Sequence, residues 1–149
     1  MCYTVKVLRR FVATKSKPFS IRLSRVTDEL ITREARRTRR SKGAVIEALA
    51  EEALRTRRFP GIAFRGADWR RRPWVIGTAL DVWEIVRASR DFGSPQEMAA
   101  ATGVTEPQIR LALAYYEEHP TEIDDALRDA DRSLDALRRE FPTIDSIVV

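Results

Sequence analysis

The sequence has little of the chemistry that enzymes and metalloproteins need. It contains one cysteine, Cys2, and one histidine, His119. A single cysteine excludes an intrachain disulfide and cannot by itself supply a structural zinc site. The chain has no Gly-rich phosphate loop, no His and Cys set at metal-ligand spacing, and no Ser/His or Cys/His pair in a catalytic context. We therefore predict a protein that is not an enzyme and that uses no metal and no cofactor.

Long apolar runs are also missing, because none approaches the roughly 18 residues that a membrane-spanning helix requires. Residues 1–12 carry Arg9 and Arg10 among their apolar residues and no small-residue cleavage site, which argues against a signal peptide. The sequence thus predicts a cytoplasmic protein without a membrane partner.

Charge is present in quantity, and it is divided unevenly along the chain. Residues 1–75 hold 20 Lys and Arg against 7 Asp and Glu, whereas residues 76–149 hold 7 against 15. The first half is therefore strongly basic, and a basic surface binds nucleic acid by releasing condensed counterions. Such asymmetry indicates two partners of opposite character.

The stretch from Pro18 to Leu54 organises the basic half. Apolar and polar residues alternate at its start, with the period of a strand that has one apolar face: Phe19, Ser20, Ile21, Arg22, Leu23 and Ser24. Helices are predicted over residues 26–38 and 42–55, and no second strand follows to pair with the first. Because a lone strand leaves its backbone groups unpaired, we predict a homodimer in which two such strands pair antiparallel.

This strand, the two helices, the turn Arg40-Ser41-Lys42 and the segment 44–49 resemble the ribbon-helix-helix fold of the CopG, Arc and MetJ repressors and of many antitoxins. In that family the outward residues of the paired strands lie in the DNA major groove. The resemblance implies base contacts from Ser20, Arg22 and Ser24. It implies phosphate contacts from Lys17, Arg40, Ser41, Lys42 and Gly43. It implies a dimer core of Phe19, Ile21, Leu23, Val45 and Leu49.

Two local consequences follow from the same resemblance. Ser41 is expected to cap the second helix, whose first amides would hold a phosphate. Arg39 stands where the family usually has glycine, so it is expected to adopt a left-handed backbone conformation. The alternative reading of this stretch is an unrelated helical hairpin that follows a strand.

A second unit is predicted from the break at Pro60-Gly61. We expect a hairpin between residues 62–64 and 73–76, then helices over 80–90, from Ser94 to about 102, and over 106–118. Ser94 followed by Pro95 and Glu97 predicts a capping box. The tryptophans are expected to be core or dimer contacts rather than a base-stacking platform: Trp69, Trp74 and Trp83.

Residues Ala99, Gly103 and Ile109 have the spacing of a helix-turn-helix. As a DNA reader, the second of these helices would bring Glu117 and Glu118 to the phosphate backbone, which would repel them. We therefore favour a structural three-helix core over a second DNA reader.

Residues 62–118 are also similar to a small winged-helix-like family that is often encoded beside PIN-like nuclease toxins and treated as an antitoxin module. The similarity lies in Val75-Ile76-Gly77-Thr78, in residues 92–99 and in Ala112-Leu113-Ala114-Tyr115-Tyr116. It implies a nuclease toxin as the partner of the C-terminal half.

The chain ends in an acidic stretch that predicts a helix over residues 122–140, capped by Thr121, and a β-prone tail over 144–149. Its apolar positions are Ile123, Leu127, Leu134 and Leu137. Two readings remain open: a helix packed on its own domain, or an arm that binds a basic partner.

The sequence thus predicts a mainly α-helical chain of four parts, namely a basic arm (1–17), a ribbon-helix-helix domain (18–58), a winged-helix-like domain (59–119) and an acidic helix and tail (120–149). The predicted function is that of a DNA-binding repressor and antitoxin of a toxin–antitoxin pair. The alternatives are a protein-interaction adaptor and a regulator without a toxin.

Overall fold

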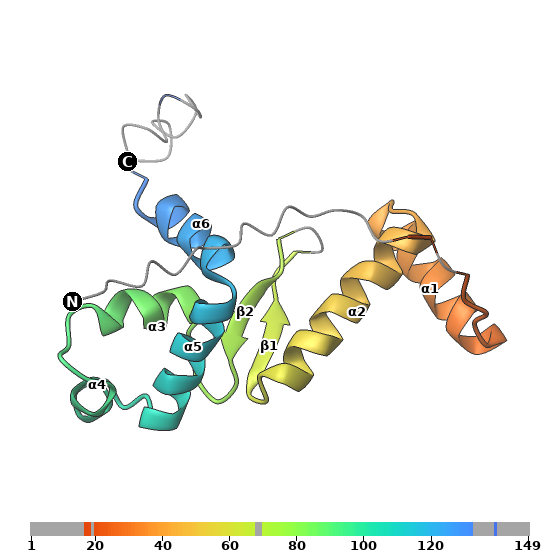
Figure 1. Cartoon of the computed structure of the whole chain (residues 1–149). Helices are drawn as coiled ribbons and strands as arrows, with labels where there is room; N and C mark the ends of the chain where they lie inside the picture. Colours follow the sequence, from red (N-terminus) through yellow and green to blue (C-terminus); the bar gives the residue numbers. More distant parts are fainter. Residues whose placement is uncertain (1–16, 19, 68–69, 133–138, 140–149) are drawn as a thin grey trace, which may run out of the picture.

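The computed structural model of the protein describes residues 17, 18, 20–67, 70–132 and 139 (Figure 1). Within these residues the chain is mainly helical, as predicted, with one small antiparallel sheet. The helices are α1 (Arg25–Thr38), α2 (Lys42–Arg58), α3 (Val82–Ser89), α4 (Pro95–Thr102), α5 (Glu106–Glu118) and α6 (Pro120–Ala130). The strands are β1 (Ile62–Arg65) and β2 (Arg72–Val75).

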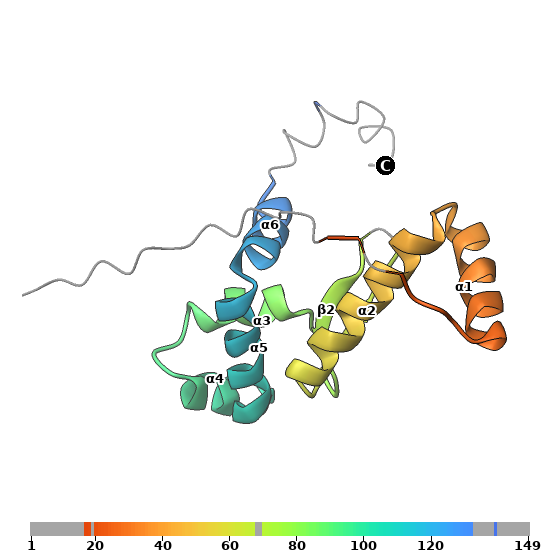
Figure 2. The ribbon, with the colours of Figure 1, turned by 45° about the vertical axis from the view of Figure 1, so that its right-hand side comes forward.

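Helices α1 and α2 form a hairpin that projects from the rest of the molecule (Figures 1 and 2). The turn between them places Arg39 in the left-handed region, with φ 54° and ψ 37°, as the sequence predicts. The Ser41 side chain then accepts a hydrogen bond from the Ala44 N–H (3.1 Å), which confirms it as the cap of α2. The buried core of this hairpin is small and consists of Ile31, Ala35 and Val45.

The larger core lies among the sheet and helices α3 to α6. Strands β1 and β2 pair as the predicted hairpin, with Ile62 opposite Val75 and Arg65 opposite Arg72. The residues of this core are almost all fully buried: Phe59, Ile62, Val75, Val82, Ile85, Val86, Met98, Val104, Ile109, Ala112, Tyr115, Ile123 and Leu127.

Helix α2 belongs to both halves of the molecule. Its first turns carry Val45 of the small core, and the residue after its last turn, Phe59, lies in the larger core. Arg58 pairs with Glu118 of α5 at 2.7 Å. The helix ends at Arg58, three residues beyond the predicted end, so it is a continuous connection between the two cores.

The predicted acidic helix over residues 122–140 is found only in part, because α6 ends at Ala130, and its start is also wrong. Helix α6 begins at Pro120, and His119 rather than Thr121 stands at its N-cap position, without a side-chain cap bond. Ile123 and Leu127 lie in the larger core, so the described part of this helix packs on its own chain. Leu134, Leu137, the tail 144–149 and the basic arm 1–16 fall outside the described residues.

Two further local predictions need correction. Ser94 caps α4, but the Glu97 carboxylate accepts from the Gly93 N–H (2.9 Å) instead of completing a capping box. Helix α3 begins at Val82 because Asp81 caps it in a capping box with Glu84. None of the helices in the described part of the chain has both the length and the apolar character that crossing a bilayer requires.

Candidate nucleic-acid interface

The α1–α2 hairpin and the segment before it leave a set of large apolar side chains uncovered by their own chain. Their exposed fractions are 59% for Ile21, 68% for Val26, 59% for Leu30, 51% for Leu49 and 66% for Leu54. Val26 and Leu30 are one turn apart on α1 and therefore share a face. Burying such side chains is worth about 1.5–3 kcal/mol each, so this apolar face favours association.

The predicted strand is not formed in the single chain, because residues 20–24 have no regular secondary structure. Among the described residues no strand pairs with this segment, and it forms no ladder of hydrogen bonds there. Of the predicted dimer core, Val45 is already buried by its own chain, Leu23 is half-buried, and Ile21 and Leu49 are exposed. Phe19 lies outside the described residues.

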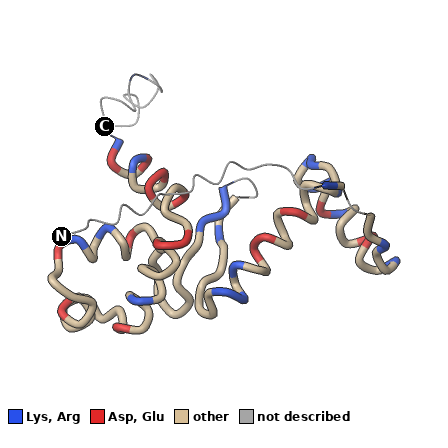
Figure 3. Tube along the Cα trace, in the orientation of Figure 1, with Lys and Arg blue, Asp and Glu red and all other residues tan. Residues whose placement is uncertain are grey.

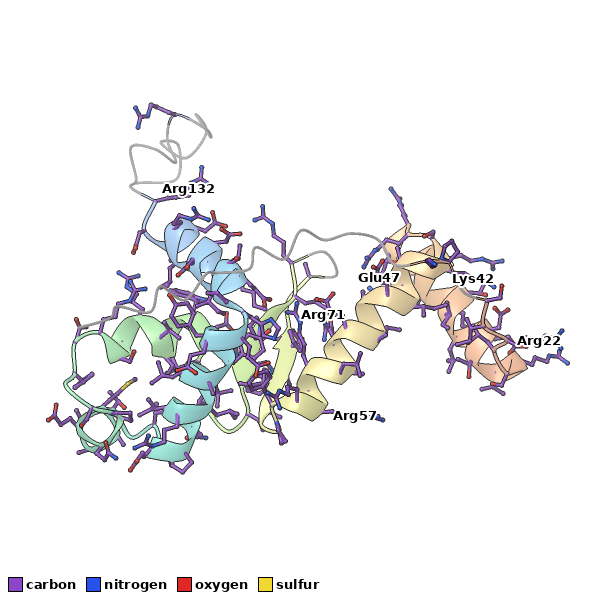
Figure 4. All side chains as sticks on the ribbon, viewed as in Figure 1. Arg22, Lys42, Glu47, Arg57, Arg71 and Arg132 are labelled. Carbon is purple, nitrogen blue, oxygen red and sulfur yellow. The ribbon has the colours of Figure 1, made fainter. Side chains whose placement is uncertain are left out.

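The three predicted base-contacting residues have different environments. Ser20 and Arg22 are exposed, and Arg22 lies near the free end of α1 (Figure 4). Ser24 instead caps α1, because its Oγ accepts from the Thr27 N–H (3.2 Å) and bonds the Thr27 hydroxyl (2.8 Å). The base contact predicted for Ser24 stays a prediction, and its role as a cap is one that a serine directly before a helix could have signalled.

Four of the five predicted phosphate-contacting residues gather at the start of α2. Arg40 donates to the Ala44 carbonyl at 3.2 Å, and the Lys42 ammonium pairs with Asp28 at 2.7 Å. Gly43 and Lys17 are exposed. The Lys42–Asp28 pair is half-exposed and therefore weak, so a phosphate can compete for Lys42.

Further cations surround this site. Arg22, Arg33, Arg36 and Arg39 are exposed, and no ion pair joins them to another described residue. Figure 3 shows Lys and Arg concentrated on the α1–α2 hairpin and the β1–β2 sheet, whereas α6 is largely acidic. The separation of charge read from the sequence is therefore also a separation in space.

The helix-turn-helix spacing gives a structural turn, as favoured from the sequence. Gly103 ends α4 with φ 73°, and Ile109 of α5 is fully buried. Arg110, the cation in the first half of α5, is paired with Glu106 at 2.7 Å. The exposed side of α5 therefore offers no surplus of positive charge to DNA.

Sequence reasoning missed a polar cluster that joins α2, α5 and α6. Arg55 donates to the Tyr115 hydroxyl (3.1 Å) and to Glu122 (2.8 Å), and the Tyr115 hydroxyl donates to Glu122 (3.0 Å). Burial and the neighbouring Glu122 carboxylate raise the pKa of Tyr115, so the phenol stays protonated. The partners are about 60 residues apart in sequence, and no local pattern signals such a contact.

A second unpredicted cluster lies at the base of the β hairpin. Asp81 is buried; its carboxylate accepts from Arg65 (2.7 Å) and from the indole N–H of Trp83 (3.3 Å). The Arg65 guanidinium also lies 5.1 Å from the ring centroid of Trp74. Trp74 and Trp83 are therefore half-buried structural contacts, and Trp69 lies outside the described residues.

The arrangement is suited to binding a polyanion rather than to catalysis by a buried acid–base pair. Among the described residues, no group of three or more His, Cys, Asp or Glu side chains is placed to hold a metal ion. Comparison of the chain with protein-family models, curated proteins and solved structures finds no match.

Proposed function

We propose that this protein is a homodimeric, sequence-specific DNA-binding repressor that reads the major groove through residues 20–22 of two paired strands. The observation that carries the proposal is the uncovered apolar face of the α1–α2 hairpin beside exposed Arg22. A second copy would cover this face and would supply the partner that the segment 20–24 lacks.

The local geometry of the hairpin supports the same function. Left-handed Arg39 and the Ser41 cap leave the amides of Lys42 and Gly43 without helix acceptors at the start of α2. A helix N-terminus of this kind favours an anion, and Arg40 and Lys42 add positive charge around it. Phosphate contacts at this point would fix the register of the strands on the duplex.

A substitution at Arg22 distinguishes sequence-specific DNA binding from nonspecific DNA binding. An arginine bidentate to guanine contributes about 1–3 kcal/mol of discrimination. We expect Arg22→Ala to reduce the preference for a specific site in the chain's own upstream DNA more than it reduces binding to a mixed-sequence duplex. Gel shifts at two salt concentrations measure both quantities.

Lys17→Ala provides the matched control, because this exposed cation is expected to contact phosphate alone. It should weaken binding to both duplexes equally. A protein-interaction adaptor would show steep salt dependence without sequence preference in the wild type, and that result would contradict the proposal.

We further propose that the acidic C-terminal half binds a basic protein, which makes the chain the antitoxin of a toxin–antitoxin pair with a PIN-like nuclease. One support is the resemblance of residues 62–118 to the winged-helix-like family that is often encoded beside PIN-like toxins. The other is the acidic surface of α5 and α6, where Glu117, Asp125 and Asp129 are exposed. Acidic and basic surfaces attract each other at long range and accelerate association.

Deleting α6 would remove Ile123 and Leu127 from the core, so charge reversal is the better test. Glu117→Lys/Asp129→Lys should reduce capture of the protein encoded by the neighbouring gene in a pulldown at low salt. Glu29→Lys/Glu47→Lys, on the α1–α2 hairpin, is the matched control. Equal capture by both variants would contradict toxin binding at this acidic surface and would favour a regulator without a toxin.

A further inference from the structure

The β1–β2 hairpin carries a second basic surface outside the α1–α2 hairpin. Its loop end lies on the same side of the molecule as the turn between α1 and α2 (Figures 1 and 2). Arg71 fixes this end against α2, because its guanidinium pairs with Glu52 at 2.7 Å and donates to the Phe64 carbonyl at 2.7 Å. Arg71 therefore has a defined position relative to α2.

Arg65, Arg70 and Arg72 form what we term the hairpin patch. They line a shallow hollow together with Gly66, Ala67 and Asp81. Asp81 neutralises Arg65, but Arg70 and Arg72 are exposed and form no ion pair with another residue that the structure describes. Two positive charges in the patch thus have no counter-charge among the described residues.

Arg72 faces a second arginine across the β hairpin, and Asp81 compensates the charge of Arg65 but not that of Arg72. Arg65 and Arg72 stand directly opposite each other in the strand register, and like charges at such positions are destabilising. Both side chains lie on the outer face of the sheet, since the alternate residues Pro73 and Val75 are buried. A polyanion bound at this face would remove the repulsion.

The acidic helix α6 does not supply that anion. Arg70, Arg71 and Arg72 share a groove with Glu122 and Asp129 of α6. Glu122 is bonded to Arg55 and Tyr115, and no ion pair joins Asp129 to Arg70 or Arg72. Arg70 and Arg72 are therefore not held by α6 and remain accessible to an external anion.

We infer that the hairpin patch is a second phosphate-contact site, which extends the DNA interface along the duplex beyond the start of α2. The inference rests on the proposed DNA-binding function. Glu52, where Arg71 is fixed, follows Lys42 by ten residues, or about 15 Å along the helix axis. At 3.4 Å per base pair, that offset corresponds to about four base pairs of additional duplex.

The test compares salt dependence for Arg70→Ala/Arg72→Ala and for wild type on a mixed-sequence duplex. Each lost phosphate contact should flatten the slope of log Kobs against log salt by about 0.9, or about 3.6 for both arginines of two protomers. Arg57→Ala/Arg110→Ala removes equal charge from the lower side of the molecule, where Figure 4 places Arg57, and should keep the wild-type slope.

A second readout uses duplex length. Wild type should gain affinity when a duplex limited to the α1–α2 contacts is extended by about five base pairs on each side, and the patch variant should not. Arg70→Lys/Arg72→Lys keeps the charge and should keep both the slope and the gain. Because Arg70 and Arg72 are exposed and form no ion pair with another described residue, the thermal midpoint should not fall. Arg70→Gln/Arg72→Gln gives a second neutral variant.

The outcomes separate this inference from the function on which it rests. A patch variant that binds duplex with the wild-type slope overturns the inference alone. A wild-type protein that does not bind duplex overturns both.

Discussion

Ser24 and Ser41 are both N-caps, because the side chain of each accepts a hydrogen bond from a backbone N–H in the first turn of the helix that follows. For Ser24, a predicted base contact, this bond engages the side-chain oxygen in the cap of α1. For Ser41 the same bond is compatible with phosphate binding, since the amides of Lys42 and Gly43 remain without helix acceptors. We therefore expect the residue at position 41 to affect stability and the proposed DNA affinity separately.

Substitutions at Ser41 can separate these two effects. Ser41→Ala should lower the free energy of unfolding by about 1 kcal/mol, because the cap of α2 is lost. Ser41→Asp should restore most of that stability, since aspartate is an equally good cap. Urea denaturation of both variants measures the change.

DNA affinity should follow a different order for the same variants. Ser41→Asp places a negative charge where a phosphate is expected, so it should bind duplex more weakly than Ser41→Ala despite being more stable. If Ser41→Asp binds DNA as well as wild type, the start of α2 does not contact phosphate.

At the scale of elements, α2, α5 and α6 meet around His119. Its ring lies 4.6 Å from the ring of Tyr115 and 5.9 Å from the ring of Phe59, measured between centroids. Burial lowers the pKa of His119 from its ordinary value of 6.5, and the nearby Arg55 lowers it further, against the opposite effect of Glu122, Glu118 and Glu51. The folded state therefore favours the neutral imidazole.

This preference makes stability depend on pH. As pH falls through 6.5 toward the lower pKa of the folded state, the unfolded chain binds the proton first, so the free energy of unfolding decreases. The stabilisation is present above that window and is lost below it. Thermal midpoints measured between pH 7.5 and 5.5 should fall for wild type and should stay nearly constant for His119→Gln.

Other groups at this junction titrate elsewhere. The hydrogen bond from Arg58 lowers the pKa of Glu118 below its ordinary 4.5, so its contribution is lost only at more acidic pH. A wild-type midpoint that does not change across the range would show that the His119 ring is as well solvated in the folded state as in the unfolded one.

The elements also show which features a sequence reveals. Helix starts at Ser41, Ser94 and Thr105 could be predicted because capping depends on residues three or four apart. The bonds from Arg55 to Tyr115 and Glu122 could not, since they join residues 60 and 67 positions apart. The start of α6 was misplaced because the close packing of Tyr115, Phe59 and His119 sets it, not a side-chain cap.

In the candidate interface, the basic composition and the alternation of apolar and polar residues identified the segment 18–54. They did not show which contacts its side chains make. The capping role of Ser24 was missed because the period-2 pattern of a strand runs directly into a helix cap. The hairpin patch was missed because cross-strand register, which places Arg65 opposite Arg72, is not visible in a linear sequence.

The whole molecule has two cores of unequal size joined by one continuous helix. The larger core is buried within its own chain. In the part of the chain that the structure describes, the smaller core has three buried residues, too few to stabilise the α1–α2 hairpin alone. Stability of the α1–α2 hairpin should therefore depend on protein concentration, as expected where association buries the remaining apolar surface.

The dimer proposal is tested most directly by placing charge on the uncovered apolar face. Leu30→Glu changes a side chain that is 59% exposed in the single chain, so the subunit should still fold. In the dimer the new carboxylate would be buried without a partner, which costs several kcal/mol of association free energy. We expect a monomer at micromolar concentration by sedimentation velocity, together with loss of duplex binding. Ile76→Glu is the matched control, because Ile76 is 51% exposed on the turn after β2. If both variants sediment as dimers and bind DNA as wild type does, the apolar face of the α1–α2 hairpin is not the subunit interface and residues 20–22 have no strand to pair with.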